Sequence, residues 1–407
     1  MDWGQIAQNR LAEIAQCSVD SEGVTRFPFT TEHGEAAKII RAWMDAAGMA
    51  VRWDAAGTLI GRKEGPAGAP TFLIGSHQDS VRNGGRYDGI MGVALGCLAV
   101  EKLTAEGTDL PFAVEVLAFA DEEGVRFPTA LMGPRALAGT FDPSVLEMTD
   151  RGGVSLRQAL ADFGGDPDGV AALRRDPAAT LGYLELHIEQ GPVLEDADVA
   201  LGIVTGICGI ERNTVIFTGD TGHAGTVPMA GRRDALVAAS EFITEVFDAA
   251  NEVVDLRATV GALSLLPNVV NAIPRHVELT LEIRALQDET RAEFAEVAQA
   301  LGQRIAEKRN AGFAMQRTYD QPAVPCDAGL VTALETAARQ GCPTAPRLPS
   351  GATHDASAMA DLCPISMLFL RCKDGVSHKP EEFASDADMA AAIEAVSTFL
   401  TSLPTGA

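Results

Sequence analysis

The sequence predicts an α/β protein: a mixed, mostly parallel sheet with helices on both faces, and an inserted ferredoxin-like α+β domain. Three observations support this class. Strand-like and helix-like segments alternate over 70–188, the order over 214–319 is β-α-β-β-α-β, and α/β character resumes near 328. Such alternation is typical of a layered α/β sheet. A chain of 407 residues also exceeds one ordinary core, so two domains are expected.

Hydrophobic periodicity predicts each element of the first part of the chain. Apolar residues at helical spacing predict a helix over 32–47, and residues 49–62 predict two strands around an Ala-Gly turn. The segment 89–103, rich in Ala, Leu, Val and Gly, predicts a helix buried against a sheet. Short apolar runs predict three strands, over 70–76, 112–120 and 181–188.

The character of the chain changes near Gly209. Long amphipathic helices are predicted over 233–251 and 288–308. Strands are predicted over 214–218, 259–265, 277–284 and 313–319. This order is the ferredoxin-like pattern.

Composition limits the partners and the compartment. The net charge of −24 disfavours binding to nucleic acid or to an anionic membrane, so an anionic substrate needs a local cationic pocket. The seven cysteines are scattered and lack CxxC spacing, which favours a reducing cytoplasm over a disulfide scaffold. We see no signal peptide and no apolar run long enough for a membrane span. The sequence therefore predicts a cytoplasmic protein.

Five separated segments contain residues that can bind metal or handle protons. They are 75–80, 85–89, 121–124, 185–191 and 374–378. They supply three imidazoles, two carboxylates and one spare glutamate, in order His77, Asp88, Glu122, Glu123, His187 and His378. Two divalent ions with one base for the attacking water require such a set. Only seven histidines exist, so three of them beside carboxylates in glycine-containing loops favour a metal site over unrelated structural histidines.

Each role has a plain structural alternative when taken alone. His77 and Asp79 lie two apart at a strand end, so Asp79 can orient His77, or can simply cap it. Asp88 before a helix can bridge two ions or be an ordinary N-cap. Glu123 is assigned as ligand and Glu122 as base, although an isolated Glu-Glu pair is more often an exposed acidic turn.

The position of His378 predicts how the domains connect. It follows the segment of ferredoxin-like order, whereas the other four motifs precede that segment. The two flanking parts must therefore fold together. We expect a di-metal catalytic domain formed by 1–209 and 326–407, with 210–325 inserted as a separate domain.

The motifs resemble the M20 metallopeptidase and amidase family, in particular its N-carbamoyl-L-amino-acid hydrolase, β-ureidopropionase and allantoate amidohydrolase branch. The motifs are Gly-Ser-His-Gln-Asp-Ser-Val, Gly-Gly-Arg-Tyr-Asp-Gly-Ile-Met-Gly-Val, Glu-Glu-Gly-Val-Arg-Phe, Glu-Leu-His-Ile-Glu-Gln-Gly-Pro, Gly-His-Ala-Gly-Thr-Val-Pro-Met and Gly-Val-Ser-His-Lys-Pro-Glu-Glu. They follow the family's order from about residue 75 to 385. His187 is discriminating, because peptidase branches usually carry a carboxylate there.

The resemblance implies two divalent ions per subunit. It implies that His77, Asp88 and His187 hold one ion, that Asp88, Glu123 and His378 hold the other, and that Glu122 activates the water. Zinc, manganese, cobalt and nickel all suit these ligands. The resemblance also implies that the inserted domain is a lid and a dimerisation domain, so a homodimer is expected.

The resemblance implies a set of substrate-binding residues as well. They are Gln190, His223, Asn271 and Arg284, with Gly351 and His354 in a further substrate-side loop. His223 resembles a transition-state donor that reaches the partner subunit's site, and Arg284 resembles the arginine that binds the substrate carboxylate. From the residues alone, Arg284 is only a charge at a strand end. Thr353 departs from the expected glycine, and the stretch 371–375 is nearer to allantoate-type members.

We therefore expect hydrolysis of a ureido C–N bond in an N-carbamoyl acid, either allantoate or an N-carbamoyl-L-amino acid. An aminoacylase or dipeptidase of the same family is the nearest alternative. A non-catalytic metal-binding homologue is another, although its ligands and Glu122 are intact. A nucleophilic cysteine is disfavoured, because these motifs contain none.

Overall fold

The structure is a computed structural model that describes residues 1–19 and 21–404. The chain forms two compact units. The first comprises Met1–Thr205, Cys326–Leu348 and Thr353–Ala407, and the second comprises Gly206–Pro325 and Pro349–Ala352. Among the described residues, no helix is both long and apolar enough to cross a membrane.

The first unit is built on seven strands of a nine-stranded mixed sheet, in the order β1-β2-β4-β3-β5-β14-β6. Its strands are β1 (Ala50–Trp53), β2 (Leu59–Lys63), β3 (Thr71–His77), β4 (Ala113–Phe119), β5 (Thr180–Ile188), β6 (Leu201–Ile207) and β14 (Ile365–Leu370). β4, β3, β5 and β14 pair in parallel, whereas β1, β2 and β6 pair antiparallel at the two sides. The predicted mixed α/β class is confirmed, with the parallel pairs at its centre.

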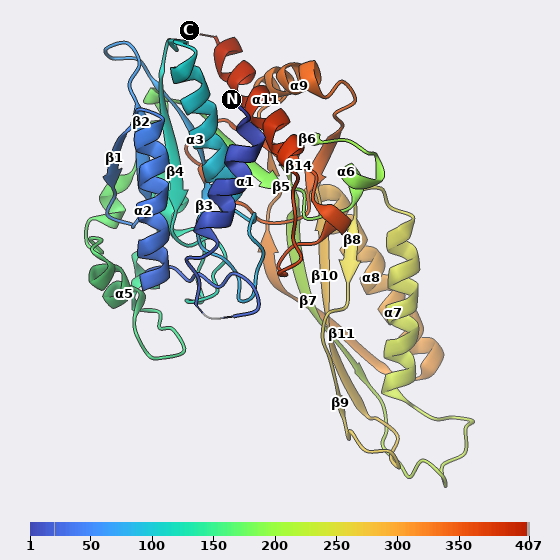
Figure 1. Ribbon diagram of the computed structural model, residues 1–407. Helices are drawn as coiled ribbons and strands as arrows, with labels where there is room; N and C mark the ends of the chain where they lie inside the picture. Colours follow the sequence, from blue (N-terminus) through green and yellow to red (C-terminus); the bar gives the residue numbers. More distant parts are fainter. Residues whose placement is uncertain (20, 405–407) are drawn as a thin grey trace. The chain divides into compact units, whose positions relative to one another are not determined.

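Helices cover both faces of this sheet, and Figure 1 labels the larger ones, including α1, α2 and α3. One face packs against α1 (Trp3–Ile14), α2 (Thr31–Ala46), α3 (Ile90–Ala105), α9 (Ala328–Gly341) and α11 (Asp386–Ser402) in one apolar core. The opposite face carries α4 (Met132–Ala138) and α10 (Asp355–Met359), and α5 (Leu156–Phe163) belongs to a smaller cluster. α3 packs so closely on β5 that a Cβ on Gly92 would overlap the Leu186 carbonyl. Glycine is required there by the close approach of the backbone.

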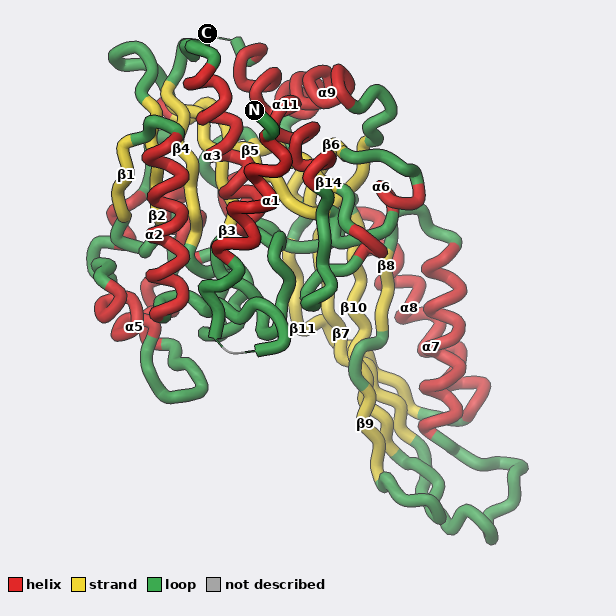
Figure 2. The backbone as a smooth tube through the Cα atoms, in the orientation of Figure 1, coloured by secondary structure: helices red, strands yellow, loops and turns green. Residues whose placement is uncertain are grey.

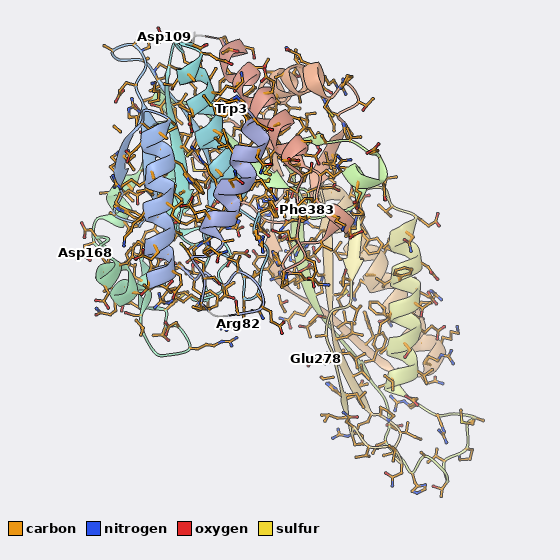
Figure 3. The ribbon with its side chains drawn as sticks, viewed as in Figure 1. Trp3, Arg82, Asp109, Asp168, Glu278 and Phe383 are labelled. Carbon is orange, nitrogen blue, oxygen red and sulfur yellow. The ribbon has the colours of Figure 1, made fainter. Side chains whose placement is uncertain are left out.

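The parallel strands bring the predicted motifs to one edge of the sheet. β3 ends at His77, β4 ends two residues before Asp121, and β5 ends one residue after His187. The carboxyl ends of parallel strands share one edge, so their loops meet there. Figure 2 shows these loops in green. Figure 3 labels Arg82, in the loop after β3, and Asp109, after α3, at opposite ends of this unit.

The second unit has the chain order β7 (Gly209–Thr218), α7 (Ala235–Asn251), β8 (Arg257–Thr259), β9 (Leu263–Leu266), β10 (His276–Ala285), α8 (Asp288–Arg309) and β11 (Gly312–Gln321). Its antiparallel sheet has the order β11-β7-β10-β8, with β9 also on β10. Alternate residues of β10 are buried against the two helices. Two-residue β12 (Val324–Pro325) pairs with Gly206 and Ile207, which belong to the same unit.

One predicted strand of this unit, 259–265, is divided into β8 and β9 in the structure. Between them, Ala262 donates its N–H to the Thr280 hydroxyl of β10 at 3.1 Å. A side-chain hydroxyl thus accepts the hydrogen bond that a backbone carbonyl accepts in a regular sheet. The hydrophobic periodicity of the sequence does not reveal this replacement. Insertion of this unit as a lid remains a prediction.

Candidate metal centre

Asp88 faces three imidazoles. Its Oδ1 lies 3.0 Å from His187 Nε2 and 3.5 Å from His77 Nε2, and its Oδ2 lies 3.3 Å from His378 Nε2. Asp88, His77 and His187 are buried, whereas the His378 side chain is half exposed. One carboxylate thus has two imidazoles at one oxygen and one at the other, the geometry expected of a bridging ligand.

Three groups of side chains are close enough to hold a cation, with ligand atoms all within 4.8 Å of one another. They are His77 with Asp88 and His187, His77 with Glu122 and Glu123, and Asp88 with Glu123 and His378. Their nitrogen and oxygen donors suit zinc and similar divalent ions. Glu123 Oε1 is buried without a hydrogen-bond partner, as expected of an oxygen that binds a cation. The residues present therefore fit divalent metal binding.

Backbone carbonyls direct the two buried histidines into this centre. His77 Nδ1 lies 3.1 Å from the Asp79 carbonyl, and His187 Nδ1 lies 2.9 Å from the Ile188 carbonyl. Each ring then presents Nε2 to Asp88. Metal-binding histidines usually donate their other ring nitrogen to an oxygen in this manner, which fixes the ring and its tautomer.

Asp79 contacts more of the centre than the spacing predicts. Its Oδ1 lies 3.4 Å from His77 Nδ1. The same carboxylate also accepts the backbone N–H groups of Glu122 at 3.1 Å and Glu123 at 3.3 Å. Asp79 therefore connects the end of β3 to the turn after β4 and holds both glutamates in place.

Glu122 and Glu123 lie near different imidazoles. Glu122 Oε2 is 4.0 Å from His77 Nε2, whereas Glu123 Oε2 is 3.9 Å from His378 Nε2. Burial raises the pKa of Glu123 to about 7, and the Asp88 carboxylate adds to this shift. Burial, with the Glu123 carboxylate beside it, holds the pKa of Glu122 well above its ordinary value.

Two residues with positive φ carry side chains to Asp88 from other loops. His378 and Gln190 both have φ of 58°, a conformation that costs energy for a residue other than glycine and is common at functional sites. Gln190 Nε2 donates to Asp88 Oδ2 at 2.9 Å and to Ser377 Oγ at 3.0 Å. Gln190, predicted to bind substrate, therefore contacts the metal centre itself.

Sequence reasoning missed two polar residues of this centre. Ser377 donates its hydroxyl to Asp88 Oδ2 at 2.9 Å. Glu185 is fully buried, and accepts from the Ser76 hydroxyl at 3.1 Å and from the Ala356 N–H at 2.8 Å. Both residues lie inside predicted motifs, Ser377 one residue before His378 and Glu185 two residues before His187. Their position in those motifs was the only sequence feature that could have identified them.

The remaining predicted substrate residues are divided between the units. His354 is in the first unit, buried, with its ring centroid 4.6 Å from that of His187. The second unit contains His223, Asn271, Arg284 and Gly351.

Within the second unit these residues lie in two pairs. The Asn271 carbonyl accepts from the N–H that follows His223, at 2.9 Å, and both side chains are exposed. Arg284 Nη1 donates to the Gly351 carbonyl at 2.6 Å, while its Nε donates to Glu282 Oε1 at 2.8 Å.

Known proteins are similar to this chain in both sequence and architecture. The profile described as "Peptidase family M20/M25/M40" matches residues 73–402. An N-carbamoyl-L-amino acid amidohydrolase of Geobacillus stearothermophilus is 41% identical over 394 residues, covering 96% of each chain. An allantoate deiminase of Arabidopsis thaliana is 37% identical, covering 97% of this chain and 81% of its own. A solved hydantoinase/carbamoylase-family amidase of Burkholderia multivorans has a TM-score of 0.91 at 32% identity, covering 98% and 97%.

Proposed function

This chain belongs to peptidase family M20/M25/M40, and on that premise we propose that it hydrolyses a ureido C–N bond of an N-carbamoyl acid. Allantoate and N-carbamoyl-L-amino acids are the substrates we consider, since relatives matched along nearly the whole chain bear those names. The observation that carries the proposal is Asp88 between His77, His187 and His378, with Glu122 and Glu123 beside them.

We propose two divalent ions per subunit, one held by His77, Asp88 and His187 and the other by Asp88, Glu123 and His378. Zinc, manganese, cobalt and nickel are all compatible with these donors. Such ions, when bound, lower the pKa of water and polarise a carbonyl oxygen.

Glu122 is the proposed general base. It removes a proton from the attacking water, the carbonyl carbon gains the water oxygen, and the C–N bond then breaks. Glu122 returns the proton to the leaving nitrogen, so the carboxylate ends the cycle unchanged. Its Oε2 lies 4.0 Å from His77 Nε2 and close to the carboxylate of Glu123, which supports a proton-handling role beside the ligands.

Substrate recognition is proposed for the polar residues that the family resemblance implies. His223 is proposed to stabilise the developing oxyanion. Arg284 is proposed to bind the substrate carboxylate, because a guanidinium binds a carboxylate through two parallel hydrogen bonds. Asn271 and Gly351, which lie beside these two residues, complete the set together with Gln190 and His354.

We also propose a homodimer that forms through the second unit. Leu263, Leu266, Val269 and Val270 of this unit are exposed apolar side chains, which are typical of association surfaces when they are contiguous. Size-exclusion chromatography with light scattering measures the mass directly, and a monomer at all concentrations contradicts this part of the proposal.

A reducing compartment, the cytoplasm, is proposed as the place of action. All seven cysteines have free thiols, and five of them are buried. Free cysteines in this number are unusual in oxidising compartments.

A substrate panel tests the proposed reaction. Metal-reconstituted protein is given allantoate, β-ureidopropionate, several N-carbamoyl-L-amino acids, an N-acetyl amino acid and a dipeptide, with ammonia and amino acid release measured. Turnover of one of the ureido substrates, at least 100-fold above the Glu122→Gln protein, is expected. Preference for the acetyl substrate or the dipeptide contradicts the ureido assignment. Failure with all of them, while metal is bound, contradicts the proposed enzyme.

A further inference from the structure

The segment after His378 returns to Asp88 through a buried glutamate. Glu382 Oε1 accepts the backbone N–H groups of Tyr87 and Asp88, both at 2.9 Å. The Glu382 residue is 3% exposed and lies 294 positions from Asp88 in the chain. One oxygen therefore accepts from two consecutive backbone N–H groups, so its position fixes this part of the backbone.

The surrounding contacts leave Glu382 little freedom. A Cβ on Gly85 would overlap the Glu382 side chain, so glycine is required for this close approach. The next residue, Phe383, which Figure 3 labels, places its ring edge-on to Tyr87 with centroids 5.9 Å apart. The Phe383 carbonyl accepts the Lys373 N–H at 2.9 Å, which closes the loop that contains His378.

Asp88 is therefore held from two sides by one loop. Glu382 holds its backbone N–H, and Ser377 donates to its side-chain oxygen. The same loop contains His378, whose Nε2 faces Asp88 at 3.3 Å. Outer contacts of this kind fix metal ligands, and their loss typically costs about 10- to 100-fold in metal affinity or activity.

We propose that Glu382 is a positioning residue that holds Asp88 and His378 in register for divalent-ion binding. The role requires an acceptor at the reach of a glutamate, and not the negative charge as such. The inference rests on the proposed metal function but does not depend on which substrate the enzyme uses.

Two conservative variants separate reach from charge. Glu382→Gln keeps an oxygen acceptor at full length and removes the charge. Glu382→Asp keeps the charge but withdraws the acceptor by about one C–C bond, roughly 1.5 Å. A positioning role predicts the larger loss for the aspartate variant, whereas electrostatic attraction of the cations predicts the larger loss for the glutamine variant.

The first measurement is titration of the metal-free proteins with Zn²⁺ and with Mn²⁺ by calorimetry. We expect Glu382→Asp to weaken the affinity for at least one ion by about 10-fold or more, and Glu382→Gln to change it by less than about threefold. With saturating metal, Glu382→Asp should lower kcat and change KM by less than about twofold, because misplacing a catalytic group by about 1 Å affects the chemical step.

The matched control is the neighbouring Glu381, which is exposed. Glu381→Gln and Glu381→Asp carry the same changes and should keep wild-type affinity. A larger loss for Glu382→Gln than for Glu382→Asp overturns the positioning role. The positioning role is also overturned if Glu382→Gln and Glu382→Asp both keep wild-type metal affinity and only lower the melting temperature of the metal-free protein.

A second variant keeps the test informative if Glu382→Asp does not fold. Gly85→Ala places a methyl group against the same carboxylate and should also weaken metal binding, so wild-type affinity in that variant contradicts the inference. The titration needs no substrate. A wild-type protein that binds metal without ureido hydrolysis therefore contradicts the proposed reaction alone.

Discussion

Asp88 is a buried carboxylate whose ionisation depends on its neighbours. Burial alone would raise the pKa of Asp88, yet His187, His378 and His77 hold it well below its ordinary value. The side chain therefore stays charged at neutral pH and available to a cation. Ser377 and Gln190 donate to one of its oxygens, so the orientation of Asp88 does not depend on the imidazoles alone.

Glu122→Gln is expected to retain metal and lose turnover. The amide is nearly the same size but cannot accept the proton of the attacking water, so kcat should fall about 10²- to 10⁴-fold. Metal content by mass spectrometry and steady-state kinetics check the two parts. Near-normal turnover would remove Glu122 from the base role, and loss of metal would make it a ligand.

His33 is expected to make the protein less stable in mild acid. Its Nδ1 accepts the Phe29 N–H at 2.8 Å, and burial, with Arg26 and Arg126 nearby, lowers the pKa of His33 from 6.5 to about 3. The unfolded chain therefore binds one more proton than the folded chain between these two values. The contribution of His33 to the free energy of unfolding is therefore present above pH 6.5 and is lost as the pH falls. The loss is about 2 kcal/mol between pH 7 and pH 5.

Urea unfolding at both pH values checks this expectation, with His33→Gln as the reference. Gln can accept a hydrogen bond but does not titrate, so the variant should lose less stability than wild type between pH 7 and pH 5. Equal losses in the two proteins contradict the expectation. Comparing differences removes the contribution of carboxylates common to both.

At the scale of elements, the centre depends on where strands end and on how closely α3 approaches them. β3 and β5 bring His77 and His187 to the same edge, and Glu185 connects both strands to α10 through Ser76 and Ala356. α3 begins immediately after Gly89, where a Cβ would overlap the His77 ring. The helix and the ligand strand are therefore in contact at the point where chemistry is proposed.

Two glycine-to-alanine changes should affect stability in opposite directions. Gly92→Ala places a methyl group against β5 and 2.9 Å from the Ser76 Cβ, so it should destabilise by about 1–3 kcal/mol through overpacking. Gly341→Ala, at the last residue of α9, meets nothing within 4 Å and should stabilise by about 0.4–1 kcal/mol by restricting the unfolded chain. Chemical denaturation of both variants measures the two signs, and a stable Gly92→Ala protein would show that α3 can move.

At the scale of the whole molecule, every proposed metal ligand lies in the first unit. The ligands come from positions 77 to 378, so a bound ion connects segments that are distant in the chain. Binding to the folded state alone stabilises it by mass action, by about 2.7 kcal/mol when the free ion is at 100 times its Kd.

Removal of metal with a chelator is therefore expected to abolish activity and lower the melting temperature. Re-addition of a divalent ion should restore both. Hydrogen exchange should show lost protection at the ends of β3 and β5, with α7 and α8 of the second unit unchanged. Lost protection confined to the second unit contradicts the proposed site, as does an unchanged melting temperature in a protein shown to have lost its metal.

The sequence by itself determined the α/β class, the approximate bounds of the main elements, and the group of residues that includes His77, Asp88 and His378. These are local properties, because periodicity depends on neighbours in the chain and ligand chemistry on the side chain itself. Only the tertiary structure decided that β14 lies between β5 and β6, and that Glu382 holds Asp88. A period-two pattern shows which face of a strand is buried but not which strand lies beside it, and a hydrogen bond across 294 positions leaves no periodic signal in the chain.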